Sequence, residues 1–115
     1  MNFAEVWTVS YRLSGARSDL LNDLPTVRQA LQDSAQAAGL HVLSCAHHTF
    51  TPQGVSLALI LSESHLAAHT WPEAGGAYVT ATSCSPASKE AVTAVADVLT
   101  RAFDAQEVTS TVVSL

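Results

Sequence analysis

Residues 55–73 read VSLALILSESHLAAHTWPE, two strand-like segments joined by a short polar link. Val55–Leu61 is largely apolar, and its density of Leu and Ile predicts a strand near the middle of a sheet. His65–Trp71 alternates between apolar and polar side chains, which predicts the next strand. Because the link is so short, the two strands must pair antiparallel. The acids, histidines and serines gathered in this stretch indicate a functional site.

Four further segments have the alternation or the β-branched composition of strands. They are Phe3–Leu13, Leu40–Phe50, Ala77–Ser83 and Glu107–Val113. In Leu40–Phe50, simple alternation would place Val42 on the same face as Ala46 and His48. Pro52-Gln53-Gly54 predicts a tight turn between this strand and the next.

Two other segments carry apolar residues at helical spacing. The first is Leu24–Ala38, with Pro25 in its first turn and Gly39 at its C-terminal stop. The second is expected to begin with Ser85 as N-cap and Pro86 at the first helical position. Its apolar stripe comprises Val92, Val95, Leu99 and Phe103.

The resulting order, β-α-β-β-β-β-α-β, predicts an α/β fold of the α+β type. We expect one domain, residues 1–115, in which two helices pack on one face of a largely antiparallel sheet. This is a two-layer sandwich. Since the helices cover only one face of the sheet, an exposed apolar face would favour a dimer.

Composition excludes several classes of protein. The net charge of −5 gives no electrostatic reason to bind nucleic acid or an anionic membrane. No apolar run approaches the roughly 20 residues that span a bilayer, and Glu5 and Arg12 interrupt any signal sequence. Cys45 and Cys84 therefore read as free thiols, and we expect a cytoplasmic protein.

Three blocks of sequence carry the chemistry. The first is HTFTPQGVS at 48–56, the second is SESH at 62–65 followed by HTWPE at 69–73, and the third is Cys84 after the next apolar segment. In order and spacing these blocks resemble those of the prokaryotic S-adenosylmethionine decarboxylase proenzymes, whose first block reads H-x-F-x-P-x-G-V-S.

The resemblance implies self-cleavage between Glu63 and Ser64. The Ser64 hydroxyl would attack the Glu63 carbonyl, the amide would become an ester, and β-elimination would follow. The products would be residues 1–63 and a chain 64–115 that begins with a pyruvoyl group made from Ser64. His69 matches the residue that removes the α-hydrogen, and Ser56 matches the serine that assists the ester step.

The resemblance also implies a decarboxylase of polyamine synthesis without PLP or metal. The pyruvoyl carbonyl would form a Schiff base with the substrate amine and accept electrons as PLP does elsewhere. Cys84 matches the acid that protonates the product carbon. Phe50, Trp71 and Glu73 match residues that hold the nucleoside of S-adenosylmethionine.

Other features of the resemblance concern orientation and assembly. His65 flanks the cleavage point and would help to orient the substrate or assist processing. The family implies a homodimer of cleaved protomers.

Departures from the family pattern leave the substrate open. Leu57 stands where glycine is usual and Thr80 where aspartate is usual, while Ser83 and Ser85 flank Cys84 in place of Thr and Gly. Relatives with the same pyruvoyl chemistry take L-arginine or L-ornithine. A further alternative is an unprocessed homologue that binds a small ligand without catalysis.

Each site residue also has an ordinary structural role available. Ser64 could be a simple turn residue, Cys84 a small buried side chain, and Phe50 and Trp71 part of the core. Five histidines raise the possibility of a metal site. His65 and His69 lie about 13 Å apart along a strand, however, at about 3.3 Å per residue. We therefore expect no metal site.

Overall fold

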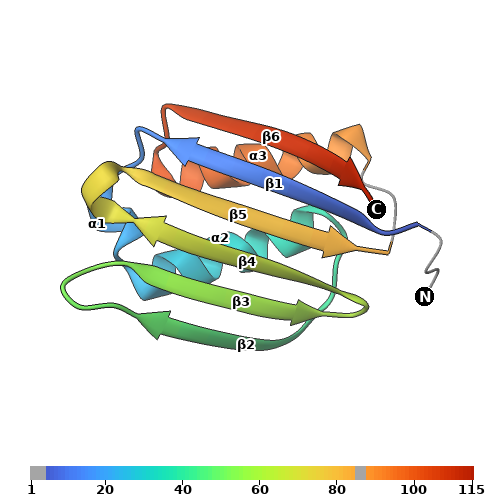
Figure 1. Ribbon diagram of the computed structural model, residues 1–115, viewed down its shortest axis with the longest axis horizontal. Helices are drawn as coiled ribbons and strands as arrows, with labels where there is room; N and C mark the ends of the chain where they lie inside the picture. Colours follow the sequence, from blue (N-terminus) through green and yellow to red (C-terminus); the bar gives the residue numbers. More distant parts are fainter. Residues whose placement is uncertain (1–4, 85–87) are drawn as a thin grey trace.

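The computed structural model describes residues 5–84 and 88–115, and it has the expected element order with two short helices added (Figure 1). The additions are α1 and the 3₁₀ helix η1. The elements are β1 (Trp7–Ser14), α1 (Ser18–Leu21), α2 (Leu24–Ala37), β2 (Val42–Thr49), β3 (Val55–Leu61), β4 (Ser64–Trp71), η1 (Pro72–Ala74), β5 (Gly76–Ser83), α3 (Lys89–Phe103) and β6 (Glu107–Ser114).

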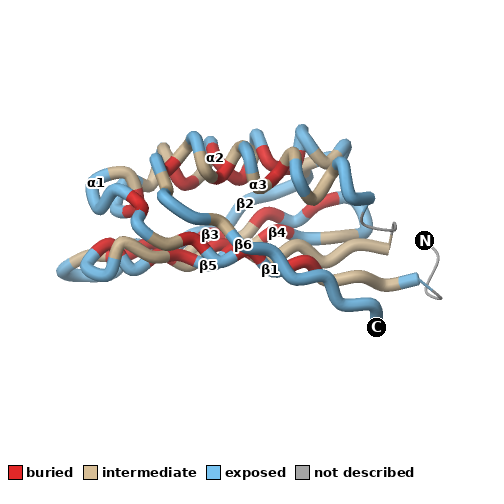
Figure 2. The backbone as a smooth tube through the Cα atoms, turned by 90° about the horizontal axis from the view of Figure 1, so that it is seen from above, coloured by how far each residue is buried: buried red, intermediate tan, exposed pale blue. Residues whose placement is uncertain are grey.

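The six strands form one sheet in the order β2-β3-β4-β5-β1-β6, and every neighbouring pair is antiparallel. Helices α2 and α3 both lie on one face of this sheet (Figure 2). The predicted two-layer sandwich is therefore confirmed. Strand β3 is interior, as its composition suggested, but it lies next to the edge strand β2.

The core lies between the helices and one face of the sheet. Every second residue of β3 from Val55 to Leu61 is buried, and the same alternation buries Val9, Tyr11 and Leu13 of β1. Fully burying a Leu or Val side chain stabilises the fold by about 1.5–3 kcal/mol. The helices contribute Val27, Ala30, Leu31, Ala35, Val95, Leu99 and Phe103.

Strand β2 departs from the alternation that its sequence predicts. Val42 pairs with Leu61, but Ser44 pairs with Ile60, so the register shifts at Leu43. An extra residue of this kind is a β-bulge, which turns the following side chains to the opposite face. Val42 therefore packs against the core. It does not share a face with His48, and the prediction that it would was wrong.

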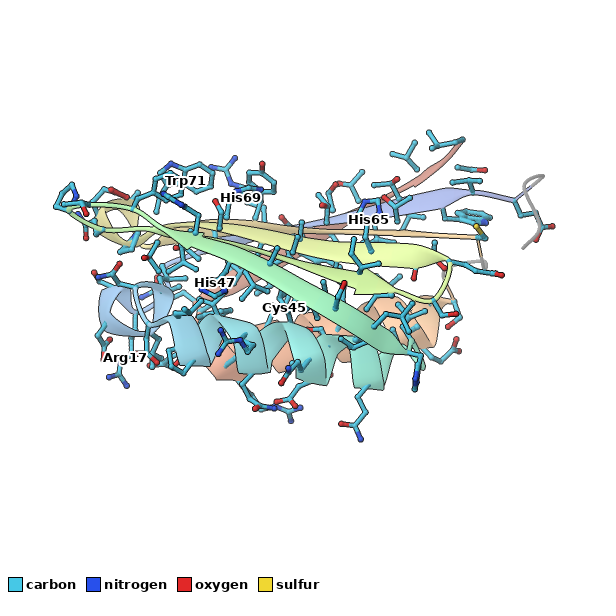
Figure 3. All side chains as sticks on the ribbon, turned by 90° about the horizontal axis from the view of Figure 1, so that it is seen from below. Arg17, Cys45, His47, His65, His69 and Trp71 are labelled. Carbon is cyan, nitrogen blue, oxygen red and sulfur yellow. The ribbon has the colours of Figure 1, made fainter. Side chains whose placement is uncertain are left out.

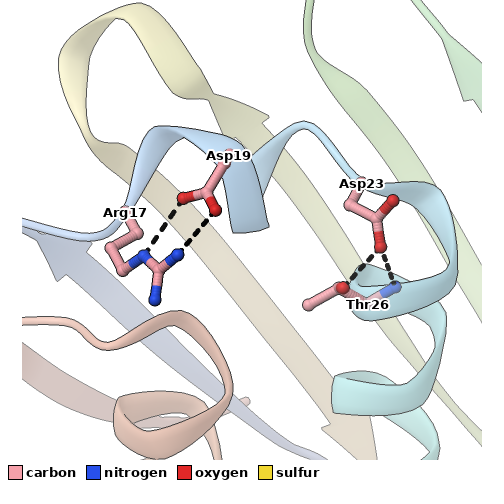
Figure 4. Close-up of polar contacts among 4 residues, drawn as sticks. All are labelled: Arg17, Asp19, Asp23 and Thr26. Carbon is pink, nitrogen blue, oxygen red and sulfur yellow. Dashed lines mark hydrogen bonds and ion pairs between the residues drawn. The ribbon is translucent and has the colours of Figure 1, made fainter.

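Both long helices begin with a side-chain cap. At the start of α2, Asp23 accepts hydrogen bonds from the backbone N–H and the hydroxyl of Thr26 (Figure 4). Figure 4 also shows the ion pair between Arg17 and Asp19 at the start of the short helix α1. Helix α3 begins at Lys89, and the Ser88 hydroxyl accepts the Ala91 N–H. The prediction that Ser85 and Pro86 start this helix was therefore wrong. Those two residues lie outside the described part of the chain.

The sheet face away from the helices, called the open face below, carries the side chains of interest. One row of Cα partners crosses all six strands on this face. From β2 to β6 it comprises His48, Ser56, His69, Tyr78, Arg12 and Thr109. A parallel row four positions further along the strands adds exposed apolar side chains, with Ile60 at 52% and Val113 at 47% exposure. Hence this face combines polar chemistry with an apolar surface.

Candidate active site

A groove on the open face collects five of the residues singled out from the sequence. It has a volume of about 360 Å³ and is lined by Phe50, Gln53, Gly54, Ser56, His69, Thr70, Trp71 and Glu73. We call it the aromatic groove. Strands β3 and β4, the 50–54 turn and η1 supply these residues, so segments from 50 to 73 converge in one place.

The polar centre of the aromatic groove is a serine–histidine pair. Ser56 of β3 and His69 of β4 are Cα partners in the sheet register, so their side chains point to the same face. The Ser56 Oγ lies 2.6 Å from His69 Nδ1, which is a short hydrogen bond. Which of the two groups donates the hydrogen depends on the tautomer of the imidazole. A histidine held in this way can act as a general base or a general acid.

Aromatic rings surround this pair. Trp71 and Tyr78 are stacked with ring centroids 5.6 Å apart, and His69 lies 5.1 Å from Tyr78. On the other side His48 meets Phe50 edge-on at 4.6 Å. Phe50 and Trp71 remain 51% and 46% exposed, so neither is a core residue. Their free surfaces are available to stack on a planar ligand.

Hydrogen bonds to Leu21, the last residue of α1, and to Asn22, which follows it, fix the turn that carries Phe50. Asn22 accepts the Gly54 N–H at 2.9 Å, while the buried Thr70 hydroxyl accepts the Val55 N–H and donates to the Leu21 carbonyl. Gly54 has a φ of 111°, a conformation that favours glycine. The short helix α1, which the sequence analysis missed, therefore supports one wall of the groove.

The expected cleavage point lies in a two-residue hairpin turn. Leu61 and Ser64 are paired, so Ser62 and Glu63 connect β3 to β4. Glu63 has a φ of 62°, in the left-handed region that side-chain-bearing residues rarely adopt. This conformation costs roughly 1–2 kcal/mol. The strained residue is the one whose carbonyl Ser64 would attack.

Cys84 lies beside this turn. Its Sγ donates a hydrogen bond to the Glu63 carbonyl oxygen at 3.5 Å, and Ser64 pairs with Ser83 in the register of β4 and β5. The Ser64 hydroxyl donates to the Ser62 carbonyl, also at 3.5 Å. Ser64, Glu63 and Cys84 thus form a second cluster, which we call the cleavage turn.

The aromatic groove and the cleavage turn lie at opposite ends of β4. His69 lies five positions after Ser64, or about 16 Å along the strand at about 3.3 Å per residue. Figure 3 shows His69 and Trp71 toward one end of the sheet and His65 toward the other. Within one chain, neither Ser56 nor His69 can reach Ser64.

His65 sits next to the cleavage turn on the open face and is exposed. Its Cα partners, Ile60 and Thr82, carry no charge. Nowhere in the described residues do three His, Cys, Asp or Glu side chains come together as a metal site would require.

Sequence reasoning missed several residues of the site. Tyr78 contacts both His69 and Trp71, and its position opposite His69 could have been found by carrying the strand alternation from β4 to β5. Gln53 and Gly54 line the groove through the turn. Asn22 gave no signal, because its contact spans 32 residues of sequence.

A sequence model of the S-adenosylmethionine decarboxylase family matches residues 8–114. The chain belongs to this family. The match covers the strands and helices that build both the aromatic groove and the cleavage turn, so the predicted family is confirmed.

Curated relatives include S-adenosylmethionine decarboxylase proenzymes of two bacteria. That of Pelotomaculum thermopropionicum is 46% identical over 72 residues, which cover 63% of this chain and 57% of the relative. That of Bacillus cytotoxicus is 42% identical over 81 residues, which cover 70% and 57%. The alignments thus span little more than half of each relative's length.

Solved structures share the fold of this decarboxylase-family chain. The adenosylmethionine decarboxylase from Aquifex aeolicus superposes with a TM-score of 0.81 at 22% identity, covering 96% of this chain and 89% of that one. The Trypanosoma brucei AdoMetDC-delta26 monomer gives 0.59 at 12% identity, covering 92% and 45%. At these identities the likeness concerns the fold alone.

Proposed function

We propose that this chain is the proenzyme of a pyruvoyl-dependent S-adenosylmethionine decarboxylase that supplies the aminopropyl donor of polyamine synthesis. Membership of the family supports the reaction class. The observation that carries the proposal is the Ser56–His69 pair at 2.6 Å, set in a groove walled by Phe50 and Trp71. It combines a proton-transfer group with surfaces for a nucleoside.

Maturation would begin at the cleavage turn. The Ser64 oxygen forms a bond to the Glu63 carbonyl carbon, and the Glu63–Ser64 amide bond breaks to leave an ester and a free amino group. A base then removes the Ser64 α-hydrogen, and the ester C–O bond breaks to leave the Glu63 carboxylate. Water hydrolyses the resulting dehydroalanine and releases ammonia. The left-handed Glu63 favours the first step, because breaking the amide relieves its backbone strain.

The pyruvoyl group made from Ser64 would supply a carbonyl electrophile that withdraws electrons during decarboxylation. The residues of the cleavage turn suit it: Cys84 already lies within hydrogen-bond range of the Glu63 carbonyl, so its thiol is next to the new N-terminus. Cys84 would protonate the product carbon, and His65, next to the cleavage turn on β4, would help orient the substrate.

The aromatic groove would hold the nucleoside. Phe50 and Trp71 offer ring faces, and stacking of a base on an aromatic ring is worth about 1–3 kcal/mol. Glu73 lines the same groove and is exposed, so its carboxylate can accept hydrogen bonds from both ribose hydroxyls. The chain's net charge of −5 suits a substrate that carries a sulfonium cation.

The separation of the two clusters supports a site that is completed by a second copy of the chain. Since Ser56 and His69 lie about 16 Å from Ser64 of the same chain, we propose that the homodimer pairs its open faces. The groove of one protomer would then complete the cleavage turn of the other. The exposed Ile60, Tyr78 and Val113 give this face the apolar area that an interface needs.

An intact mass spectrum of the purified protein tests maturation. Fragments of residues 1–63 and 64–115, the second with a pyruvoyl N-terminus, are expected. A chain that stays uncut after long incubation would refute maturation and favour a non-catalytic, ligand-binding homologue.

Co-expression of two defective chains tests the shared site. Ser64→Ala retains His69 but cannot be cut, while His69→Ala retains Ser64. In mixed dimers the His69→Ala chain should be cut, because its partner supplies the histidine. The control pairs His69→Ala with the Ser64→Ala/His69→Ala double variant, which should give no cleavage. If the first pair also stays uncut, the site is not shared.

Substrate identity is tested separately, by measuring carbon dioxide release from S-adenosylmethionine, L-arginine and L-ornithine. Release from S-adenosylmethionine is expected. Release of carbon dioxide only from L-arginine or L-ornithine would show that the substrate is that amino acid, while the pyruvoyl chemistry would still apply. Thr80 on the open face, where the family resemblance would put an aspartate, is the reason to include the amino acids.

We propose the cytoplasm as the compartment, since Cys45 and Cys84 are free thiols. None of the helices in the described part of the chain is long and apolar enough to cross a membrane. The proposed partners are a small-molecule substrate and a second copy of the chain, with neither nucleic acid nor membrane.

A further inference from the structure

A second groove on the open face has a different chemical character from the aromatic groove. It has a volume of about 640 Å³ and lies over β1, β5 and β6. Its polar side chains are Ser10, Arg12, Tyr78, Thr80, Thr109 and Thr111. Trp71 lines both grooves. We call this second groove the arginine groove.

The charge of the arginine groove comes from one residue. Of the five Lys and Arg residues in the chain, at positions 12, 17, 28, 89 and 101, only Arg12 lies on a strand. No acidic residue lines the groove. Among the described residues the ion pair found is Arg17–Asp19, and Arg12 has no carboxylate partner. The nearest acid in the sheet register is Glu107, which pairs with Ser14 in the next row of the same face, and Arg12 makes no ion pair with it.

We infer that the arginine groove binds a small planar carboxylate. A guanidinium presents a rigid fork of N–H donors that matches a carboxylate, and it holds a single positive charge, which balances a monoanion. Ser10 and Thr80 are Cα partners in the next row of the sheet, as are Ser10 and Thr111, so their hydroxyls border the same space. They can complete the hydrogen bonding of the carboxylate.

The planar body of the ligand is inferred from the aromatic wall. Tyr78 is the Cα partner of Arg12, so the two side chains leave the sheet from adjacent positions on the open face. Tyr78 stacks with Trp71 at an interplanar angle of 29°, and the two residues are 41% and 46% exposed. A flat apolar group beside the carboxylate would cover these rings.

The proposed dimer gives a further reason to expect a carboxylate in the arginine groove. Pairing the open faces would remove Arg12 from water, and an unpaired buried charge is strongly destabilising. A bound carboxylate would neutralise it. This last argument rests on the proposed function, whereas the groove, its charge and its rings belong to a single chain.

The test is a titration of the full-length chain with sodium benzoate, monitored through the NMR signal of the Trp71 indole N–H. The Trp71→Phe variant assigns this signal. Benzamide has the same shape without the charge, and sodium chloride matches the ionic strength. A saturable shift is expected with benzoate. A shift of equal size and midpoint with benzamide would overturn the inference.

Substitutions test whether Arg12 provides the positive charge that binds benzoate. Arg12→Gln should abolish the saturable shift, and Arg12→Lys should weaken benzoate binding roughly threefold to tenfold, because a point charge cannot bind both oxygens in the same way. Arg101→Gln on α3 makes the same change of charge and should leave binding unaltered. Binding that survives Arg12→Gln would refute the site. Because the readout is binding, its failure would not bear on the proposed decarboxylation.

Discussion

Ser56 and His69 face each other across β3 and β4, with Oγ 2.6 Å from Nδ1. The pair is organised before any ligand arrives, yet it lies about 16 Å along the sheet from Ser64. Its position in an aromatic groove, on a sheet face that the helices leave bare, directs its chemistry toward a molecule or chain that packs on that face.

His69→Ala should slow self-cleavage by roughly 10²–10⁴-fold, the usual contribution of a general base. If His69 removes the Ser64 α-hydrogen, the ester forms but does not eliminate. Hydroxylamine, which cleaves esters, should then cut the variant at residue 63. The check is a gel time course with and without hydroxylamine. His47→Ala on the edge strand should mature at the normal rate. Normal cleavage of His69→Ala would remove the histidine from the mechanism.

Glu63→Gly should mature roughly threefold to tenfold more slowly than Glu63→Ala. Both variants lose the carboxylate, but only glycine adopts the φ of 62° without the cost of about 1–2 kcal/mol. The measurement is the first-order rate of cleavage. Asp104→Gly also relieves a positive φ, of 49°, at the end of α3, and it should leave the cleavage rate unchanged. Equal rates for the two Glu63 variants would show that backbone strain does not contribute.

Cys84→Ala should separate maturation from turnover. Cleavage should slow by no more than about tenfold, because the variant loses one weak thiol hydrogen bond. Decarboxylation should fall by about 10²–10⁴-fold through loss of the acid. Mass spectrometry measures cleavage, and carbon dioxide release measures decarboxylation. Cys45→Ala, on the exposed edge strand, should behave as the native protein. Full turnover by Cys84→Ala would assign the proton donor elsewhere.

Thr70→Val should lower the free energy of unfolding by about 1–3 kcal/mol, because the buried Val55 N–H loses its acceptor. Urea denaturation in a Ser64→Ala background, which keeps the chain intact, measures the effect. Thr82→Val removes the Thr8–Thr82 hydroxyl contact in a part-buried position and should cost less than about 0.5 kcal/mol. A cost for Thr70→Val no larger than that would mean that the hydroxyl does not secure the groove wall.

Tyr11 should make stability depend on alkaline pH. Burial raises the pKa of the Tyr11 hydroxyl to about 12 from 10.0. The unfolded chain therefore loses this proton at lower pH than the folded chain does. The stability that Tyr11 contributes is complete below pH 10 and is lost as pH rises from 10 to about 12. Tyr11→Phe should show a shallower decline across that range in urea denaturation. Parallel curves would contradict the assignment.

Much of the fold could be predicted from local pattern alone. The apolar run of β3 and the alternation of β4 fixed two strands, because side chains on a strand alternate between faces. The bounds of Val55–Leu61 and Leu24–Ala37 agree with the predicted segments to within one residue. The predictions that failed depended on a residue's immediate neighbours. One extra residue at Leu43 reversed the faces of β2, and Ser88 is the cap of α3.

The sequence by itself determined the family, the element order and the identity of the chemical groups, because these depend on residue type and spacing along the chain. Only the tertiary structure decided which groups meet. The register of β3 and β4 brings Ser56 to His69 and keeps both far from Ser64, and pairing of β5 with β1 sets Tyr78 beside Arg12. Such contacts join residues distant in sequence, and their geometry is set by the packing and register of the whole sheet.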